Sequence, residues 1–282
     1  MERLKQMMTE RGLGNYYERM KHLARNAIHV EPVVVPADEI PVGASKFGGI
    51  PDLPEGFVWP RLADGAPLPF LCQFDLAELA PYDRDGLLPK EGLLSFFYDV
   101  NPMPDCWYDE EGWAVFYHVG QELKRQRGPE DVPGYFTSAR VEITATPELP
   151  FLHSDIIQVE KLEGNEYWDL WEFTDHLAAT GDDSTDVCTK LLGHARPVQS
   201  GGGLELTCER FHRRKYGSEG CRYEDPRDPR NACRWINLLQ LDSHENVGWI
   251  WSGGYGRVYF WIEEDDLKNC RFDRVAVIAE RS

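Results

Sequence analysis

The sequence predicts a β-dominated α+β fold built from two similar β-rich halves, and two observations support this prediction. Short apolar runs separated by Gly, Pro and polar turns fill most of the chain after residue 30, which is typical of strands joined by tight turns. Three motifs of the first part return later in the same order, which indicates an internal duplication. We therefore expect two β-units packed about a pseudo-twofold axis. The motifs "SKFGGIP", "FLCQFDL" and "GLLSFFYD" correspond in this order to the later motifs "TKLLGHARP", "NLLQLDS" and "GRVYFWIE".

Helices are expected at the N-terminus and between the two halves. Apolar residues from Leu13 to Ala27 recur three and four positions apart, a spacing that lines one face of a helix. Two glycines separate this segment from Glu2–Glu10, which we interpret as a turn or short helix. The N-terminal helical segment should cover a sheet edge. The stretch "EYWDLWEFTDHLAAT" has the same periodicity and predicts a bridging helix, followed by the linker candidate "GDDSTD".

Five apolar runs predict the strands of the first half: "VVV" near Val34, "FLCQFDL", "LLSFFYDV", "WAVFYHV" and "ARVEITA". The run from Gly92 to Val100 has almost no polar alternation, so it should be a central strand buried on both faces. We expect a single domain over residues 1–282. Its parts are a helical arm at 1–30, a first β-rich half at 31–160, a bridging helix and linker at 161–186 and a second β-rich half at 187–282.

Composition and charge exclude several classes of partner. The formal net charge is -18, and this field repels nucleic acid and anionic membranes, so a basic protein partner is expected instead. Charged residues recur every few positions in the first thirty residues, which predicts neither a signal peptide nor a membrane span. The seven cysteines are an odd number scattered along a large chain. They predict free thiols, no disulfide framework and a cytoplasmic location.

Five motifs together carry a family resemblance. They are "SKFGGIPDLPEGFVWP", "FLCQFDLAEL" with "LLPKEGLLSFFYD", "KLLGHARPVQ", "INLLQLDS" and "GRVYFWIEEDDLKNCRFDRV". In this order, from Ser45 to Val275, they resemble the YwqG-like family, a bacterial group of unknown function. The resemblance implies an internally duplicated, β-dominated α+β fold and a cytoplasmic location. It implies no reaction, cofactor or catalytic residue. The Cys- and Arg-rich stretch from Cys208 to Cys233 departs from the family pattern.

Two carboxylates at matching strand ends are the first candidates for chemistry. Gln73 precedes Asp75 as Gln240 precedes Asp242, and both carboxylates could face a pocket shared by the halves. Two carboxylates in different environments can divide acid and base roles, and a nearby histidine could act as a further base. The structural alternative is that Gln and Asp at a strand end bond turn amides. The catalytic candidates are Asp75, Asp242, His244 and His194.

A zinc site is the sharpest chemical alternative. Cys208 and His212 stand four apart and would share a face of a helix, and Cys221 and Cys233 follow. Four such ligands could close a tetrahedral site. Zinc modules usually have a close ligand pair on each side of the site, whereas only one pair is close here, so no cofactor is expected. We interpret the basic run "RFHRRKYG" as a solvated loop and "SGGGLEL" as a turn before a strand, without the helix that would aim amides at a phosphate.

The aromatic residues and the missing catalytic motifs favour a binding function. Trp and Tyr gather densely in "WYDEEGWAVFYHV" and "GWIWSGGYGRVYFW", and such side chains anchor interfaces. We expect a non-catalytic acidic scaffold, specifically an immunity-type or regulatory protein that neutralises a basic partner. The alternatives are a hydrolase or metal-assisted enzyme with a pocket between the two halves, and a small-molecule binding module. The binding-cleft candidates are Gln73, Gln240, Trp107, Trp251 and Tyr255.

Overall fold

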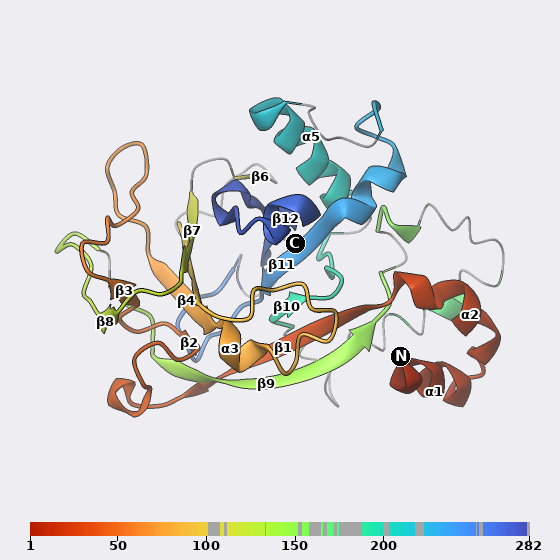
Figure 1. Ribbon diagram of the computed structural model, residues 1–282, viewed down its shortest axis with the longest axis horizontal. Helices are drawn as coiled ribbons and strands as arrows, with labels where there is room; N and C mark the ends of the chain where they lie inside the picture. Colours follow the sequence, from red (N-terminus) through yellow and green to blue (C-terminus); the bar gives the residue numbers. More distant parts are fainter. Residues whose placement is uncertain are drawn as a thin grey trace.

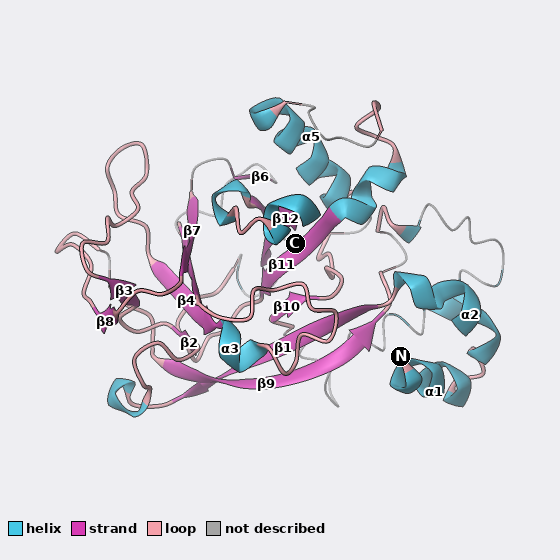
Figure 2. Cartoon of the chain, in the orientation of Figure 1, coloured by secondary structure: helices cyan, strands magenta, loops and turns pink. Residues whose placement is uncertain are grey.

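Strands dominate the computed structural model, as the sequence predicts, and helices lie around them (Figure 2). Within the described part of the chain, eleven strands form one sheet and two more form a separate ribbon. No described helix has the length and apolarity needed to cross a membrane. The structure describes residues 1–100, 108–109, 112–132, 134–151, 154–157, 165, 168–171, 174, 188–199, 203–217, 223–251, 253 and 256–280.

The large sheet has antiparallel neighbours throughout its described strands. In spatial order the strands are β6 (Tyr108–Asp109), β13 (Ala276–Glu280), β12 (Arg257–Glu263), β11 (Trp235–Leu241), β10 (Lys190–Leu192), β1 (Arg25–Val34), β9 (Ala139–Glu148), β2 (Lys46–Phe47), β4 (Phe70–Asp75), β5 (Leu93–Tyr98) and β7 (Trp113–His118). The separate ribbon pairs β3 (Asp52–Pro54) with β8 (Leu123–Arg125). The five strands predicted in the first half are confirmed as the end of β1 and as β4, β5, β7 and β9.

The described helices are short, apart from two at the periphery of the sheet (Figure 1). The α-helices are α1 (Glu2–Glu10), α2 (Tyr17–Met20), α3 (Leu76–Leu79), α5 (Leu204–Tyr216) and α6 (Glu264–Lys268). The 3-10 helices are η1 (Gly14–Tyr16), η2 (Lys21–Leu23), η3 (Ala37–Glu39), η5 (Pro229–Arg234) and η7 (Phe272–Arg274).

The two ten-residue strands β1 and β9 form the centre of the sheet. They pair along their whole length, with Arg25 opposite Glu148 and Val34 opposite Ala139, and appear in Figure 1 as two long strands, β1 in red and β9 in green. On one side of this pair follows the block β2-β4-β5-β7, and on the other the block β10-β11-β12-β13. Each long strand precedes one block in the chain but hydrogen-bonds to the other: β1 pairs with β10, and β9 with β2.

The two blocks pair their strands in the same register. Lys46 of β2 lies opposite Gln73 of β4, and Lys190 of β10 lies opposite Gln240 of β11. One strand further out, Gln73 is opposite Ser95, and Gln240 is opposite Tyr259. The repeated motifs of the sequence therefore occupy matching places in the two blocks.

The largest apolar core takes residues from both blocks, so the blocks pack on one another. Phe96 of β5 lies 5.2 Å from Phe260 of β12, measured between ring centroids, and Phe47 of β2 lies 5.8 Å from Trp249. Every residue of β5 is buried: Phe96 joins this core, and Phe97 joins a second cluster on the other face. The prediction of a strand buried on both faces is therefore confirmed.

The predicted helix from Leu13 to Ala27 is wrong in its second part. The chain forms the short turns η1, α2 and η2, and β1 begins at Arg25. The apolar spacing places Leu13, Tyr17 and Met20 on one side, where they pack with α1. The following residues join the sheet instead, because β1 gains a partner strand on each side. The N-terminal helices pack against Leu149 near the end of β9 and not against an outer edge of the sheet.

Helix α5 replaces a predicted turn, strand and loop. Gly203 of "SGGGLEL" directly precedes α5, and "RFHRRKYG" forms its second half. Leu204, Cys208 and Phe211 recur three and four apart and pack around Trp235, so burial of this apolar stripe favours a helix. Trp168–Trp171 are helical, as the bridging helix requires. The linker at residues 181–186 lies outside the described residues.

The Gly48→Ala variant is expected to lose about 2–3 kcal/mol of unfolding free energy, since it combines backbone strain with overpacking. Gly48 has a φ of +58°, and an added Cβ would overlap the carbonyl oxygen of Thr137. Gly56→Ala is the matched control, because Gly56 has a φ of +76° and nothing lies within 4 Å of its Cβ position. In urea unfolding, Gly56→Ala should lose only about 1 kcal/mol of unfolding free energy, because it has the backbone strain without the overpacking. Equal losses in the two variants would contradict the close approach at Gly48.

Candidate functional site

A pocket of about 440 Å³ opens where β4 runs into α3. Its wall includes Asp75, Glu78, Leu93 and His118, and all of its lining residues fall between 41 and 123. The pocket thus lies within the first half, whereas the sequence placed a pocket between the halves. Its volume falls in the range of ligand pockets, about 300–1,000 Å³.

Local sequence explains why carboxylates line this pocket. β4 ends at Asp75, where α3 begins. The Oδ1 atom of Asp75 accepts a hydrogen bond from the amide of Ala77 (2.9 Å) and so caps α3. One turn later, Glu78 Oε2 accepts from the amide of Ser45 (3.0 Å). Within the described part of the chain, no cation pairs with either carboxylate, and Asp75 Oδ2 has no hydrogen-bond donor. Burial raises the pKa of Asp75; the Ala77 amide lowers it, and the charge of Glu78 raises it further.

His118 closes the pocket from β7. The side chain is 8% exposed, its ring stacks on Phe116, and its Nε2 makes no hydrogen bond within the described structure. Burial lowers the pKa of His118, against a hydrogen bond to Gln121 that raises it. A neutral imidazole therefore lines the same pocket as the two carboxylates, and it does not repel a cation.

Gln73 and Gln240 hold the backbone and do not face a cleft. Both side chains are fully buried. Gln73 Nε2 donates to the carbonyl of Ala44 (2.9 Å), and its Oε1 accepts from the amide of Asp52 (2.9 Å). Gln240 makes the same two contacts, with the carbonyl of Cys188 (2.6 Å) and the amide of Arg196 (2.9 Å). These bonds match the structural interpretation of the repeated Gln.

The four catalytic candidates are not brought together by hydrogen bonds or ion pairs among the described residues. Asp242 accepts from Arg257 Nε at 2.8 Å and from the amide of Cys188 at 2.9 Å. His244 Nε2 lies 2.7 Å from Thr189 Oγ1, and burial lowers its pKa to about 4, against the charge of Asp242.

His194 lies in a different environment from His244. Its Nε2 is 2.7 Å from the carbonyl oxygen of Leu23. Burial, with the charge of Arg25, lowers the pKa of His194 to about 3. Of the four catalytic candidates, Asp75 is the one that lines the 440 Å³ pocket.

The aromatic cleft candidates divide between the core and the undescribed part of the chain. Trp251 is 2% exposed, and its indole Nε1 donates to the carbonyl of Asp242 (3.1 Å). It contributes to the core and not to a surface. Trp107 and Tyr255 lie outside the described residues.

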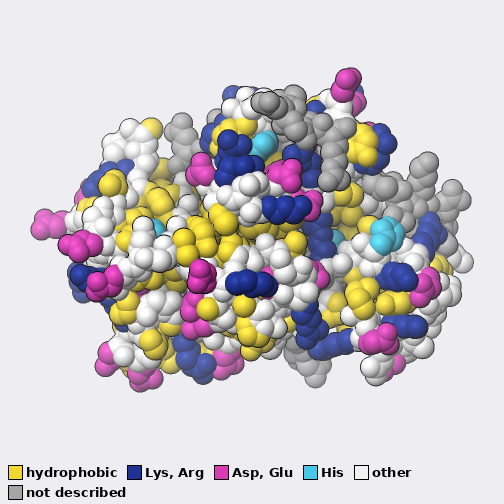
Figure 3. All heavy atoms as spheres, viewed as in Figure 1, with side chains coloured by type: hydrophobic (Ala, Val, Ile, Leu, Met, Phe, Trp, Pro, Cys, Tyr) yellow, Lys and Arg dark blue, Asp and Glu magenta, His cyan; other side chains and the backbone are white. Residues whose placement is uncertain are grey.

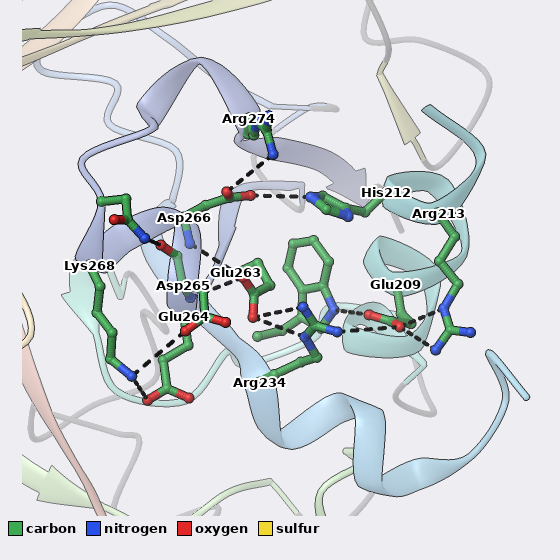
Figure 4. Close-up of polar contacts among 12 residues, drawn as sticks. Glu209, His212, Arg213, Arg234, Glu263, Glu264, Asp265, Asp266, Lys268 and Arg274 are labelled. Carbon is green, nitrogen blue, oxygen red and sulfur yellow. Dashed lines mark hydrogen bonds and ion pairs between the residues drawn. The ribbon is translucent and has the colours of Figure 1, made fainter. Parts of the chain in front are cut away.

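The zinc candidates on α5 face different neighbours. Cys208 is fully buried in an apolar cluster, and burial raises the pKa of its thiol. His212 extends from the helix toward α6, where its Nε2 lies 3.1 Å from Asp266 Oδ2 (Figure 4). Cys233 is exposed, and Cys221 lies outside the described residues. Within the described part of the chain, no three His, Cys, Asp or Glu side chains are grouped to hold a metal ion.

Ion pairs occupy the space between α5, η5 and α6. Glu209 Oε1 accepts from Arg213 Nε (2.7 Å), and Glu209 Oε2 accepts from the indole of Trp235 (3.0 Å). Arg234 Nε donates to Glu263 Oε1 (2.9 Å), and Figure 4 shows these contacts as one network. Because each of these charges has a partner within the protein, removing one partner would leave a buried charge unpaired and destabilise the attachment of α5 to the sheet.

A buried charge cluster beside β1 was missed from the sequence. Lys190 Nζ donates to both carboxylate oxygens of Glu148, at 2.9 and 2.7 Å, and His29 Nε2 lies 3.4 Å from Glu148 Oε1. Burial opposes the charge of Glu148, but Lys190 and His29 lower its pKa to about 2. The repeated lysine was the available signal: its counterpart Lys46 pairs with the buried Asp52 at 2.7 Å.

Comparison with known proteins gives one family. No curated protein matches the chain. The family model described as a domain of unknown function, DUF1963, matches residues 45–280. This span contains both strand blocks and eight of the twelve residues that line the pocket, while residues 41–44 of the pocket and β1 precede it. The chain therefore belongs to the DUF1963 family.

Proposed function

We propose that this protein is a non-catalytic, cytoplasmic binding protein that receives a basic group of a protein partner in the pocket beside α3. The observation that carries the proposal is the pair Asp75 and Glu78, which face a pocket of about 440 Å³ without a cation of their own. The five described cysteines are free thiols, which supports a reducing compartment.

The pocket explains recognition better than a broad acidic surface does. On the face shown in Figure 3, acidic and basic side chains are interspersed. The net charge of -18 steers a basic partner toward the protein over long distances, and a pair of fixed carboxylates then selects the group that docks. A hydrolase would need its acid and base within hydrogen-bond reach, whereas Asp75 and Asp242 have separate partners.

We infer that the two strand blocks are copies of one unit that has exchanged its long first strand with its neighbour. The equal registers of Lys46 with Gln73 and of Lys190 with Gln240 support this, as do the identical backbone bonds of the two glutamines. We also infer that the family match and the YwqG-like resemblance describe one relationship, because the matched residues contain all the motifs that carry the resemblance.

Purified protein is expected to bind a fluorescently labelled tetra-arginine peptide saturably, with an affinity that falls as salt rises. The Asp75→Asn/Glu78→Gln variant should bind at least about tenfold more weakly, since each lost charged contact is worth ~1.5–3 kcal/mol. Asn at 75 retains an oxygen that can cap α3. Fluorescence anisotropy at two salt concentrations gives the measurement.

The matched control removes the same two charges elsewhere. Glu31→Gln/Glu130→Gln changes two exposed carboxylates outside the pocket lining. It should bind the peptide within about threefold of the unaltered protein, because distant exposed charges are screened. An equal loss in both double variants would overturn the proposal, since it would mean diffuse attraction by net charge alone.

A further inference from the structure

The two blocks differ at one position beside the repeated aspartate. In the first block Asp75 lies opposite Leu93 across the β4–β5 pair. In the second block Leu241 lies opposite Val258, and extending this antiparallel register by one pair sets Asp242 opposite Arg257. Directly opposed residues point to the same face of a sheet. Leu93 and Arg257 therefore stand in equivalent places relative to the two aspartates.

The aspartates themselves are held alike. The amide of Asp75 donates to Ser45 Oγ (2.9 Å), and the amide of Asp242 donates to Thr189 Oγ1 (3.0 Å). Each carboxylate also accepts from a following backbone amide, that of Ala77 or that of Ser243. The supporting contacts are thus similar, but Asp242 Oδ2 also accepts from the amide of Cys188 and from a cation, Arg257.

In the second block Arg257 satisfies the aspartate from within the protein. Its Nε lies 2.8 Å from Asp242 Oδ2, and its Nη1 donates to the carbonyl of Arg196 (2.9 Å). Arg257 is 6% exposed, so this guanidinium fills the space beside the carboxylate. In the first block the shorter, uncharged Leu93 stands in that place and is 2% exposed, and Asp75 and Leu93 both line the pocket.

We propose that the pocket binds a guanidinium group in the place that Arg257 occupies in the second block. This rests on the proposed function and names its ligand chemistry: an arginine side chain of the basic partner. A guanidinium suits the site better than an ammonium because it is planar, more weakly hydrated and can address two carboxylates with its forked donors. Glu78, one turn of α3 beyond Asp75, supplies the second carboxylate.

The environment of His118 supports a cationic occupant. Its buried ring lines the same pocket, and its Nε2 is without a hydrogen bond in the described structure. A neutral imidazole offers one acceptor nitrogen to a donor-rich ligand. The occupant would therefore meet two carboxylates and an acceptor, and no fixed positive side chain lines the pocket.

The test uses five probes on the full chain: labelled tetra-arginine, tetra-lysine and tetra-citrulline peptides, and methylguanidinium and methylammonium as competitors. Tetra-arginine should bind at least about tenfold more tightly than tetra-lysine, because the forked donors add a second charged hydrogen bond. Tetra-citrulline, which keeps the shape without the charge, should not bind. Equal binding of the arginine and lysine peptides through Asp75 and Glu78 would overturn the guanidinium site and leave the proposed function standing. Failure of all three peptides would overturn both.

Leu93→Arg is the decisive variant, since it recreates the internal pair of the second block. It should weaken tetra-arginine binding by at least about tenfold, because its own guanidinium occupies the site. Leu93→Met is the matched control of similar volume without charge and should bind like the unaltered protein. Full binding by a folded Leu93→Arg protein would overturn the proposal. If Leu93→Arg fails to fold, the single variant Asp75→Asn must lose arginine selectivity for the proposal to hold.

Competition with methylguanidinium distinguishes the two possible sources of the guanidinium group, a free small molecule and an arginine of a protein partner. Displacement of the peptide by millimolar methylguanidinium supports a guanidinium subsite that a small molecule can fill on its own. Peptide binding that resists methylguanidinium but is lost in Leu93→Arg supports the arginine of a protein partner, whose neighbouring residues add affinity. Displacement by methylammonium at the same concentration would contradict selectivity for guanidinium.

Discussion

Glu148→Ala is expected to lower the unfolding free energy by about 3–5 kcal/mol, which is the usual result of removing one partner from a buried ion pair. Lys190 is 1% exposed and donates to both oxygens of Glu148. The variant leaves this ammonium buried without an anion and deprives His29 of the same carboxylate. It also removes the acceptor of the amide of His194. The loss is large because β1, β9 and β10 meet at this point.

Urea unfolding followed by fluorescence measures this loss, and two variants calibrate it. Glu31→Ala removes an exposed carboxylate from the same strand pair and should change stability by less than about 0.5 kcal/mol. Glu148→Leu/Lys190→Met replaces both charges with apolar groups and should be more stable than Glu148→Ala. A double variant that is less stable than the single one would show that the charges are needed for more than neutralising each other.

The same cluster predicts a pH window for its contribution to stability. The pKa of Glu148 falls to about 2 in the folded chain, from an ordinary value of 4.5, so its contribution is present above pH 4.5 and is lost as pH falls toward 2. Burial opposes the charge of His29, but the nearby Cys188 and Glu148 raise its pKa from 6.5 to about 9. Its contribution is present below pH 6.5 and is lost as pH rises through 9. Both contributions are present together from pH 4.5 to 6.5.

The strands were predictable from the sequence, and the pairing between them was only partly so. Apolar runs such as Leu93–Tyr98 identify buried strands because burial of both faces demands an unbroken run. The start of β1 was assigned to a helix because its partners, β9 and β10, lie more than a hundred residues away, so local periodicity cannot reveal them. α5 was misread because the glycines before it resemble a turn, while its apolar stripe becomes evident only against Trp235.

The candidate site shows the same division between local and tertiary information. The Gln-x-Asp repeat located Asp75 and Asp242 at strand ends, and their amide contacts are local. The difference between them is not local. It depends on whether Leu93 or Arg257 stands across the strand pair, and this is evident only when the register is known. Lys46 and Lys190 were visible in the repeat, but their carboxylate partners come from different parts of the chain.

Neither residues 1–186 nor residues 187–282 are expected to fold cooperatively when produced alone. The second fragment lacks β1, so β10 loses its backbone partner on that side. The first fragment keeps β1, β9 and the block β2-β4-β5-β7, but it loses the apolar surface against which this block packs: Phe260 no longer covers Phe96, and Trp249 no longer covers Phe47. Burial of one such large side chain contributes about 1.5–3 kcal/mol, and a domain has only about 5–15 kcal/mol to lose.

Near-ultraviolet circular dichroism and urea unfolding of each fragment test this expectation. Each fragment alone should lack the fixed aromatic signal and a sigmoidal transition. Mixing the two should restore both, because the strand pair β1–β10 can form between separate chains as it does within one. The control is the full chain cut once between the same residues, which should unfold cooperatively. A sigmoidal transition in either isolated fragment would instead show that this fragment has an independent hydrophobic core. The pairing of β1 with β10 would then join two separate domains.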